Sequence, residues 1–298
     1  MRICLTSCLI SMALSLFAQP QVEYKKRMPG SVQISTCTYE ERDHFMITTP
    51  SAIYYYDRAG GGLSRMIDRD GKDWIAFKKE PWDQYPASAA SAYRGIPNLV
   101  FRSDDGGAGH PGHDQCTSEQ INKNSIRTIS KSGKWQWTWQ FFDDYARLNV
   151  QKVDPDYAYW FLYEGTPGGE FEPNQQYFGT DKGGPKYDQL DYYAGEKQFD
   201  HWNWAYFGHR SSGRIFFIGQ LHPDELSDTF SYLGNSEAGI RAEDGMVVFG
   251  FGRAEGAQPL MKNPNSFLLG FHEEQIVDSE DHQRFSKKIM NLIRTKRN

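Results

Sequence analysis

The sequence predicts a mostly β protein, a large antiparallel β-sandwich (supersandwich) with one C-terminal helix. Three observations carry this prediction: apolar and polar residues alternate in several segments, Gly-rich turns separate these segments, and one long amphipathic helix follows them. No repeat of fixed period and no low-complexity linker divides the chain. We therefore expect a single domain over residues 19–298, because sandwiches of this length occur as one domain.

The clearest strand signal is the alternation of aromatic residues with Gln and Thr over residues 135–141. A period of two places the aromatic rings on one face of a sheet. Residues 157–163 are apolar almost throughout, as in a strand that is covered on both faces. A helix with one apolar stripe is predicted over residues 279–295. Later strands are predicted over residues 202–206, 214–219, 246–251 and 267–271.

The N-terminus resembles an export signal. Arg2 supplies a positive charge and residues 3–17 are mainly apolar. This run of about 15 residues is shorter than a membrane span needs and matches a signal peptide, which we place at residues 1–18. A lipobox-like sequence ends at Cys8, but it lies so near the start that lipid anchoring is the weaker alternative. No other segment is apolar enough to span, so we expect a secreted or periplasmic protein.

Charge and cysteine content narrow the class further. The formal net charge is −5 and the Lys and Arg residues are scattered, which argues against nucleic acid as a partner. Removal of the signal would leave Cys37 and Cys116. Two thiols in an oxidising compartment can pair, so we expect a disulfide between them.

The first candidate site is the Gly- and Pro-rich loop over residues 109–114, which contains His110 and His113. Histidine can serve as an acid or a base near neutral pH. Zinc binding is a second use, but the spacing is a weak pattern without a third ligand. A structural turn is the alternative to any site. We predict neither a metal nor a cofactor.

The second candidate is Glu164, at the end of the apolar segment and before a Gly-rich loop. A carboxylate at a strand end can be partly buried, and burial raises its pKa towards the acid–base range. Glu170 and Glu172 follow closely, and paired carboxylates are typical of glycosidases. Ordinary surface positions are the alternative for all three.

The third candidate is a set of aromatic residues, because sugar rings have apolar faces that stack on aromatic side chains. Core packing is the alternative, and it is favoured for the tryptophans of residues 135–139. His201 and His209 are interpreted as structural. The aromatic residues in or next to loops, which we predict to bind substrate, are Trp82, Tyr177, Tyr187 and Trp202.

Motifs of other enzyme classes do not occur. The sequence has no Gly-x-Ser-x-Gly elbow, no His-Glu-x-x-His motif and no Cys-x-x-Cys motif. Serine hydrolase and zinc protease chemistry therefore have no support.

Three short segments resemble the galactose mutarotase-like superfamily of β-supersandwiches. Residues 56–74 form a Gly-rich turn, a strand and an Asp-x-x-Gly hairpin, and residues 95–98 and 110–113 resemble the family's Gly-x-Pro segment and its pocket histidine. The resemblance implies a sugar site on the concave face of the larger sheet. A mutarotase uses a histidine acid and a late glutamate base, for which Glu255, Glu273 and Glu274 are available. Polysaccharide lyases of this fold instead use Tyr or His as a base, while Arg, Asn or His neutralises a uronate.

We therefore expect an exported carbohydrate-active enzyme that acts on a poly- or oligosaccharide by proton transfer, of lyase or epimerase type. His110, His113 and Glu164 are the predicted acid–base residues. A non-catalytic carbohydrate-binding protein and a structural protein of the cell envelope remain as alternatives. The predicted charge partners are Arg94, Asn98 and Arg102.

Overall fold

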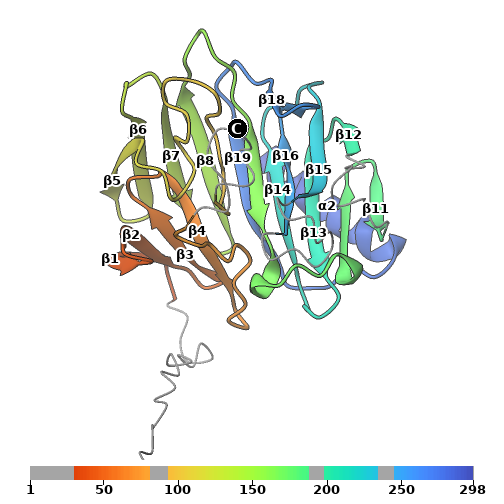
Figure 1. The fold of residues 1–298 in the computed structure, drawn as a ribbon. Helices are drawn as coiled ribbons and strands as arrows, with labels where there is room; N and C mark the ends of the chain where they lie inside the picture. The colour runs from red at the N-terminus through yellow and green to blue at the C-terminus, as the bar shows by residue number, and fades with distance from the viewer. Residues whose placement is uncertain (1–29, 81–92, 188–197, 234–244, 298) are drawn as a thin grey trace, which may run out of the picture.

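The computed structural model describes residues 30–80, 93–187, 198–233 and 245–297. A nine-stranded antiparallel sheet forms the centre of the molecule, and two four-stranded antiparallel sheets lie side by side against one of its faces (Figure 1). Helix α2 covers part of the other face. The predicted mostly β sandwich with a C-terminal helix is confirmed.

The nine-stranded sheet has the order β11-β10-β13-β14-β19-β8-β7-β6-β5. Its strands are β5 (Cys116–Asn122), β6 (Ser125–Ser130), β7 (Gln136–Phe141), β8 (Tyr145–Lys152), β10 (Gln176–Thr180), β11 (Gly183–Lys186), β13 (Trp204–His209), β14 (Ile215–Gln220) and β19 (Ser266–His272).

Two smaller sheets cover this sheet. The first has the order β1-β2-β3-β4 and the second has the order β12-β15-β16-β9. Their strands are β1 (Gln33–Tyr39), β2 (Arg42–Thr48), β3 (Ala52–Asp57), β4 (Gly62–Asp68), β9 (Phe161–Gly165), β12 (Gln198–Asp200), β15 (Asp228–Leu233) and β16 (Met246–Phe251). The short strands β17 (Arg253–Ala254) and β18 (Gln258–Pro259) form a ribbon after β16, and 3-10 turns η1 (Pro167–Gly169) and η2 (Pro173–Gln175) follow β9.

The alternation in the sequence explains how the layers pack. In β7 the rings of Trp137, Trp139 and Phe141 are fully buried between the sheets, whereas the intervening polar residues are only half-buried. Phe141 meets Tyr54 of the first small sheet at a ring distance of 5.3 Å. The predicted sheet face is confirmed, and it forms one half of the core.

The second half of the core repeats this arrangement. Phe161 of β9 stacks on Phe267 of β19 at 4.4 Å, and Phe230 of β15 stacks on Phe178 of β10 at 3.9 Å. The predicted strand at residues 157–163 is wrong in its limits, because β9 begins at Phe161. Residues before it instead pair singly with other loops, as Tyr159 does with Met261.

Helix α2 (Ser279–Arg297) begins at the predicted residue and extends two residues past the predicted end. The carboxylate of Asp278 accepts hydrogen bonds from the backbone of Glu280 (2.9 Å) and Asp281 (3.0 Å), which satisfies free N–H groups of the first turn. Phe285, Ile289 and Ile293 form its buried stripe against the nine-stranded sheet. None of the described helices combines the length and apolar character needed to cross a bilayer.

Two groups of predictions remain: some fall on residues outside the described ranges, and one concerns a disulfide bond. The signal segment 1–18, Cys8 and Trp82 lie outside the described residues. The predicted disulfide is absent, since Cys37 and Cys116 are both free. Cys37 belongs to the edge strand β1, whereas Cys116 is buried with its Sγ directed at Gly61, between β3 and β4.

Candidate active site

The candidate site forms where a loop segment pairs with β9. Gly95 exchanges two backbone hydrogen bonds with Glu164, of 2.8 and 2.9 Å, and the N–H of Leu162 donates to the carbonyl of Pro97 at 2.8 Å. Tyr163 of β9 packs in the central core, so the side chain of Glu164 lies on the opposite face of the strand. The candidate cluster therefore lies on the outer face of the second small sheet, whereas the resemblance implied a sugar site on the larger sheet.

Asn98 holds the carboxyl group of Glu164. Its Nδ2 donates a hydrogen bond of 2.6 Å to Oε1 of Glu164, and both side chains are fully buried. Asn98 has φ of 48°, in the left-handed region that non-Gly residues rarely adopt. Its own carbonyl accepts a hydrogen bond from Nε1 of Trp160. Such conformations persist where surrounding contacts enforce them, and they concentrate at functional sites.

His110 faces the other oxygen of the same carboxyl group. Its Nε2 lies 3.7 Å from Oε2 of Glu164 and 2.8 Å from the carbonyl oxygen of Tyr93. Because that carbonyl can only accept, Nε2 carries the proton and Nδ1 has a free lone pair. Burial, followed by the neighbouring His113, lowers the pKa of His110 to about 3. His110 is therefore neutral at pH 7.

Glu164 has a strongly altered pKa. Burial raises the pKa of its carboxyl group to about 8, against opposing effects of Arg253 and of the hydrogen bond from Asn98. The group is therefore mainly protonated at pH 7. With a pKa close to the operating pH, Glu164 meets the requirement for a general acid near neutral pH, and the neighbouring imidazole of His110 stays neutral.

Arg253 is a site residue that sequence reasoning missed. It begins β17, is buried, and its guanidinium group lies over the ring of Trp160 at 5.2 Å. Its charge acts on Glu164, and burial lowers its own pKa. The available signal was an arginine directly after a wholly apolar strand and Gly252, which has φ of 71°. A charge at such a point is either exposed or compensated, and the sequence does not distinguish the two.

His113 lies beside His110 but does not face Glu164. The two imidazole rings are 5.4 Å apart, and the ring of Tyr93 meets His113 edge to face at 5.1 Å. Burial, and then Arg42, lower the pKa of His113 to about 4. The ring of His113 packs so closely on Gly107 that a Cβ there would lie 2.6 Å from it. This explains the glycine at position 107, just before the loop.

The other predicted charge partners lie around the cluster rather than within it. Arg94 is buried and donates to the backbone carbonyls of Ala76 (3.2 Å) and Gly245 (2.9 Å). Arg102 is exposed, with its guanidinium over Phe101 at 4.8 Å. Among the contacts of the described residues, Asn98 is thus the one predicted charge partner that binds the carboxyl group of Glu164.

Of the aromatic residues predicted to bind substrate, those that the structure describes do not lie at this cluster. Tyr177 and Tyr187 are 5.5 Å apart, and Tyr177 belongs to the core beneath α2, on the far side of the nine-stranded sheet. Trp202 is part of the central core. Trp82 lies outside the described residues.

The other acidic candidates of this loop are exposed rather than buried with Glu164. Glu170 and Glu172 are exposed, and Glu172 instead forms an ion pair of 3.1 Å with His209. His201 pairs with Glu225 at 3.0 Å. In the described ranges, no group of three or more His, Cys, Asp or Glu residues is placed to hold a metal ion.

The cluster leaves polar atoms without partners. Among the described residues, no hydrogen bond is made by four buried atoms: Glu164 Oε2, Asn98 Oδ1, His110 Nδ1 and one terminal nitrogen of Arg253. Buried polar atoms are nearly always satisfied, by protein, water or ligand. Together these atoms offer both donors and acceptors, which is the complement of a hydroxyl-bearing molecule.

Comparison with solved structures agrees with the fold. HI1317 matches with a TM-score of 0.52 and 10% identity, over 80% of this chain and 96% of that chain. A galactose mutarotase related enzyme from Lactobacillus acidophilus has a TM-score of 0.44 and 9% identity, over 82% and 100% of the two chains. A galactose mutarotase-like protein from Lactobacillus casei has a TM-score of 0.42 and 6% identity, over 80% and 100%. No protein-family model and no curated protein matches the sequence.

These likenesses concern the fold. The match to HI1317 supports the β-sandwich fold that the sequence predicted. At such low identity, any activity has to be argued from the residues of the site itself.

Proposed function

We propose that this chain is an exported carbohydrate-active enzyme that transfers protons on a poly- or oligosaccharide, with lyase- or epimerase-type chemistry. One observation carries the proposal: Glu164, His110, Asn98 and Arg253 form a buried cluster whose polar atoms lack partners among the described residues. Sugars suit these atoms, because a hydroxyl group can both donate and accept a hydrogen bond and a ring oxygen can accept one.

Complementary acid and base groups support proton transfer. Protonated Glu164 can donate a proton from Oε2, while Nδ1 of neutral His110 can accept one. In epimerase-type chemistry the acid protonates the ring oxygen as the base removes the proton of the anomeric hydroxyl group. In lyase-type chemistry the base removes the proton next to a carboxylate, and the acid protonates the departing glycosidic oxygen. Both schemes conserve the protons.

Arg253 favours a sugar that carries a negative charge. Since Glu164 is mainly protonated at pH 7, the buried guanidinium of Arg253 has no full countercharge from it. Among the described residues Arg253 forms no ion pair, and a carboxylate ligand would neutralise a buried charge that is costly to leave without a partner. Arg253 thus takes the role that the sequence interpretation gave to Arg94 and Arg102.

Hydrolysis with two carboxylates has less support. That mechanism needs a second acid within roughly 5–10 Å of the first. The two nearest acids in sequence, Glu170 and Glu172, are exposed, and Glu172 pairs with His209 instead.

The test is incubation of the protein with matched acidic and neutral glycans. Absorbance of unsaturated uronates reports lyase activity, reducing ends report hydrolysis, and NMR of anomeric protons reports epimerase-type activity. Activity that is lost in both Glu164→Gln and His110→Gln supports the proposal. Activity that survives both changes, or the absence of any binding or turnover across the panel, contradicts it.

A further inference from the structure

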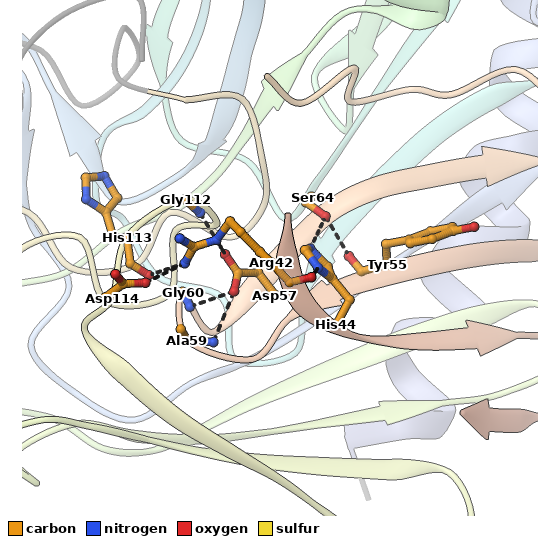
Figure 2. A network of polar contacts seen from close by, with 10 residues as sticks. All are labelled: Arg42, His44, Tyr55, Asp57, Ala59, Gly60, Ser64, Gly112, His113 and Asp114. Carbon is orange, nitrogen blue, oxygen red and sulfur yellow. Dashed lines mark hydrogen bonds and ion pairs between the residues drawn. The ribbon is translucent and has the colours of Figure 1, made fainter. Parts of the chain in front are cut away.

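We infer that Asp57 and Arg42 position the histidine loop, residues 109–114, so that His110 meets Glu164; this inference rests on the proposed function. Neither residue touches Glu164. Figure 2 shows the side chains of Arg42, from β2, and Asp57, from β3, directed at the loop, with their contacts drawn as dashed lines.

Asp57 is the centre of this network. It ends β3, and its buried carboxylate accepts four hydrogen bonds. Oδ1 accepts from the backbone N–H groups of Ala59 (3.0 Å) and Gly60 (3.1 Å), and Oδ2 accepts from the N–H of Gly112 (2.8 Å) and from Nε of Arg42 (2.7 Å). A buried carboxylate with filled acceptor positions is held in one orientation. The backbone of Gly112 is therefore fixed relative to β3.

Arg42 attaches the loop at two further points. One terminal nitrogen of its guanidinium donates to the carbonyl of His113 (3.1 Å) and to Oδ1 of Asp114 (2.7 Å). The planar guanidinium can bond Asp57 and the loop simultaneously, which lysine cannot do with the same geometry. The side chain thus links β2, β3 and the loop.

The backbone on both sides comes into direct contact. The N–H of Gly109 donates to the carbonyl of Gly60 at 2.9 Å, and a Cβ on Gly60 would lie 2.6 Å from the carbonyl oxygen of His110. The Gly-rich turn after β3 therefore has a specific purpose, because it lets the loop lie against it. The placement of His110 at 3.7 Å from Glu164 depends on these attachments, since in the described structure its ring makes one hydrogen bond, to the carbonyl of Tyr93.

The test follows His113, whose imidazole reports the position of the loop without any sugar. The groups that face it are Arg42 of β2, Asp57 of β3, and Asp114, His110 and Tyr93 near the loop. The variants are Arg42→Gln and Arg42→Lys. The matched control is Arg127→Gln, which removes an arginine that is also paired with a carboxylate, Glu119, but lies on β6.

Histidine side-chain NMR, assigned with His110→Gln and His113→Gln, measures the titration of each ring. Arg42→Gln removes a charge that lowers the pKa of His113 and frees the loop, so we expect that pKa to rise by about one pH unit or more. Arg42→Lys keeps the charge but loses the forked hydrogen bonds of the guanidinium. It should therefore displace the His110 and His113 resonances, with a smaller rise in the pKa of His113 than Arg42→Gln gives. Arg127→Gln should change neither ring.

Unchanged His110 and His113 resonances in both Arg42 variants would overturn the inference. If Arg42→Gln fails to fold by circular dichroism, Arg42→Lys decides alone: displaced resonances support the inference and parental ones overturn it. These measurements need no substrate, so a failure of every glycan leaves them valid and contradicts the proposed function separately. If a glycan is turned over, Arg42→Lys should lower kcat with little change in KM, because the affected group is a positioning residue.

Discussion

Asn98 and Glu164 are 66 residues apart in the sequence, yet Nδ2 of Asn98 donates a hydrogen bond of 2.6 Å to Oε1 of Glu164. Both side chains are buried, on the face of the second small sheet that points away from the central core. The bond leaves Oε2 directed towards His110, at 3.7 Å. The amide therefore selects which carboxyl oxygen is available for chemistry. Neutral Glu164 carries its proton on Oε2, which accepts no hydrogen bond from Asn98, and this proton is available to a ligand because Nε2 of His110 is itself protonated.

Replacement of Glu164 by Gln should abolish turnover without unfolding the protein. Gln has nearly the same shape and is uncharged, as Glu164 mainly is at pH 7. A positioned acid or base contributes roughly 10²–10⁴-fold to a rate, so we expect a loss of at least about 100-fold. Glycan turnover and thermal unfolding are the measurements. Glu170→Gln, which changes an exposed carboxylate, should match the parent in both. Equal activity of the two variants would exclude Glu164 as the acid.

The same substitution should change how stability depends on pH. The pKa of Glu164 is raised in the folded state to about 8, so the folded protein holds this proton more tightly than the unfolded chain. Its contribution is fully present below the unfolded pKa near 4.5 and is lost as pH rises towards 8, by about 1.4 kcal/mol per pH unit. His110 acts in the opposite sense. Because its pKa is lowered to about 3, stability from His110 is lost as pH falls from 6.5 towards 3.

Urea unfolding between pH 6 and 9 separates the two groups, since His110 no longer titrates in most of this window. The parent should lose stability as pH rises to about 8, and Glu164→Gln should lose much less. The difference between the two proteins should therefore grow with pH and then level off. Parallel curves over the whole window would show that Glu164 titrates normally.

Removal of the charge on Arg253 should raise the pKa of Glu164 further. Arg253 opposes the effect of burial on that carboxyl group. In Arg253→Met the alkaline loss of stability should move upward by about one pH unit or more, while the methionine still packs on Trp160. Arg102→Met is the matched control, because Arg102 lies over Phe101 but is exposed. If the two variants shift the alkaline midpoint equally, Arg253 has no special influence on Glu164.

Much of the fold follows from local patterns. Alternation predicts the buried rings of β7, and an apolar stripe predicts α2 from its first residue. The limits of β9 are harder, because Tyr159 and Trp160 are as apolar as the strand that follows and are buried by loops instead. Residues that loops bury have the same apolar composition as residues that are buried within a hydrogen-bonded strand, so composition alone does not separate the two.

The site is only partly visible in the sequence. His110 and Glu164 each stand out by their local context, and Asn98 by the Gly-x-Pro segment before it. Their contact depends on Gly95 pairing with Glu164, which no local pattern specifies. Tyr177 and Trp202 show the converse, since rings next to loops can be core residues once distant layers cover them. Arg253 is recognisable only when its buried neighbours are known.

The shape of the histidine loop should depend on Gly112 for two separable reasons. Gly112 has φ of 95°, and a Cβ there would lie 2.7 Å from the ring of Tyr93. Gly133 is the matched control, because it has φ of 72° and a Cβ at that position would have nothing within 4 Å. Gly133→Ala should cost about 1–2 kcal/mol of unfolding free energy, the cost of a left-handed alanine. Gly112→Ala should cost about 1–3 kcal/mol more, because the ring of Tyr93 must move. It should also displace the His110 and His113 resonances, which Gly133→Ala should leave in place. Equal losses in chemical denaturation, with unchanged imidazole resonances, would mean that the ring of Tyr93 does not constrain this loop.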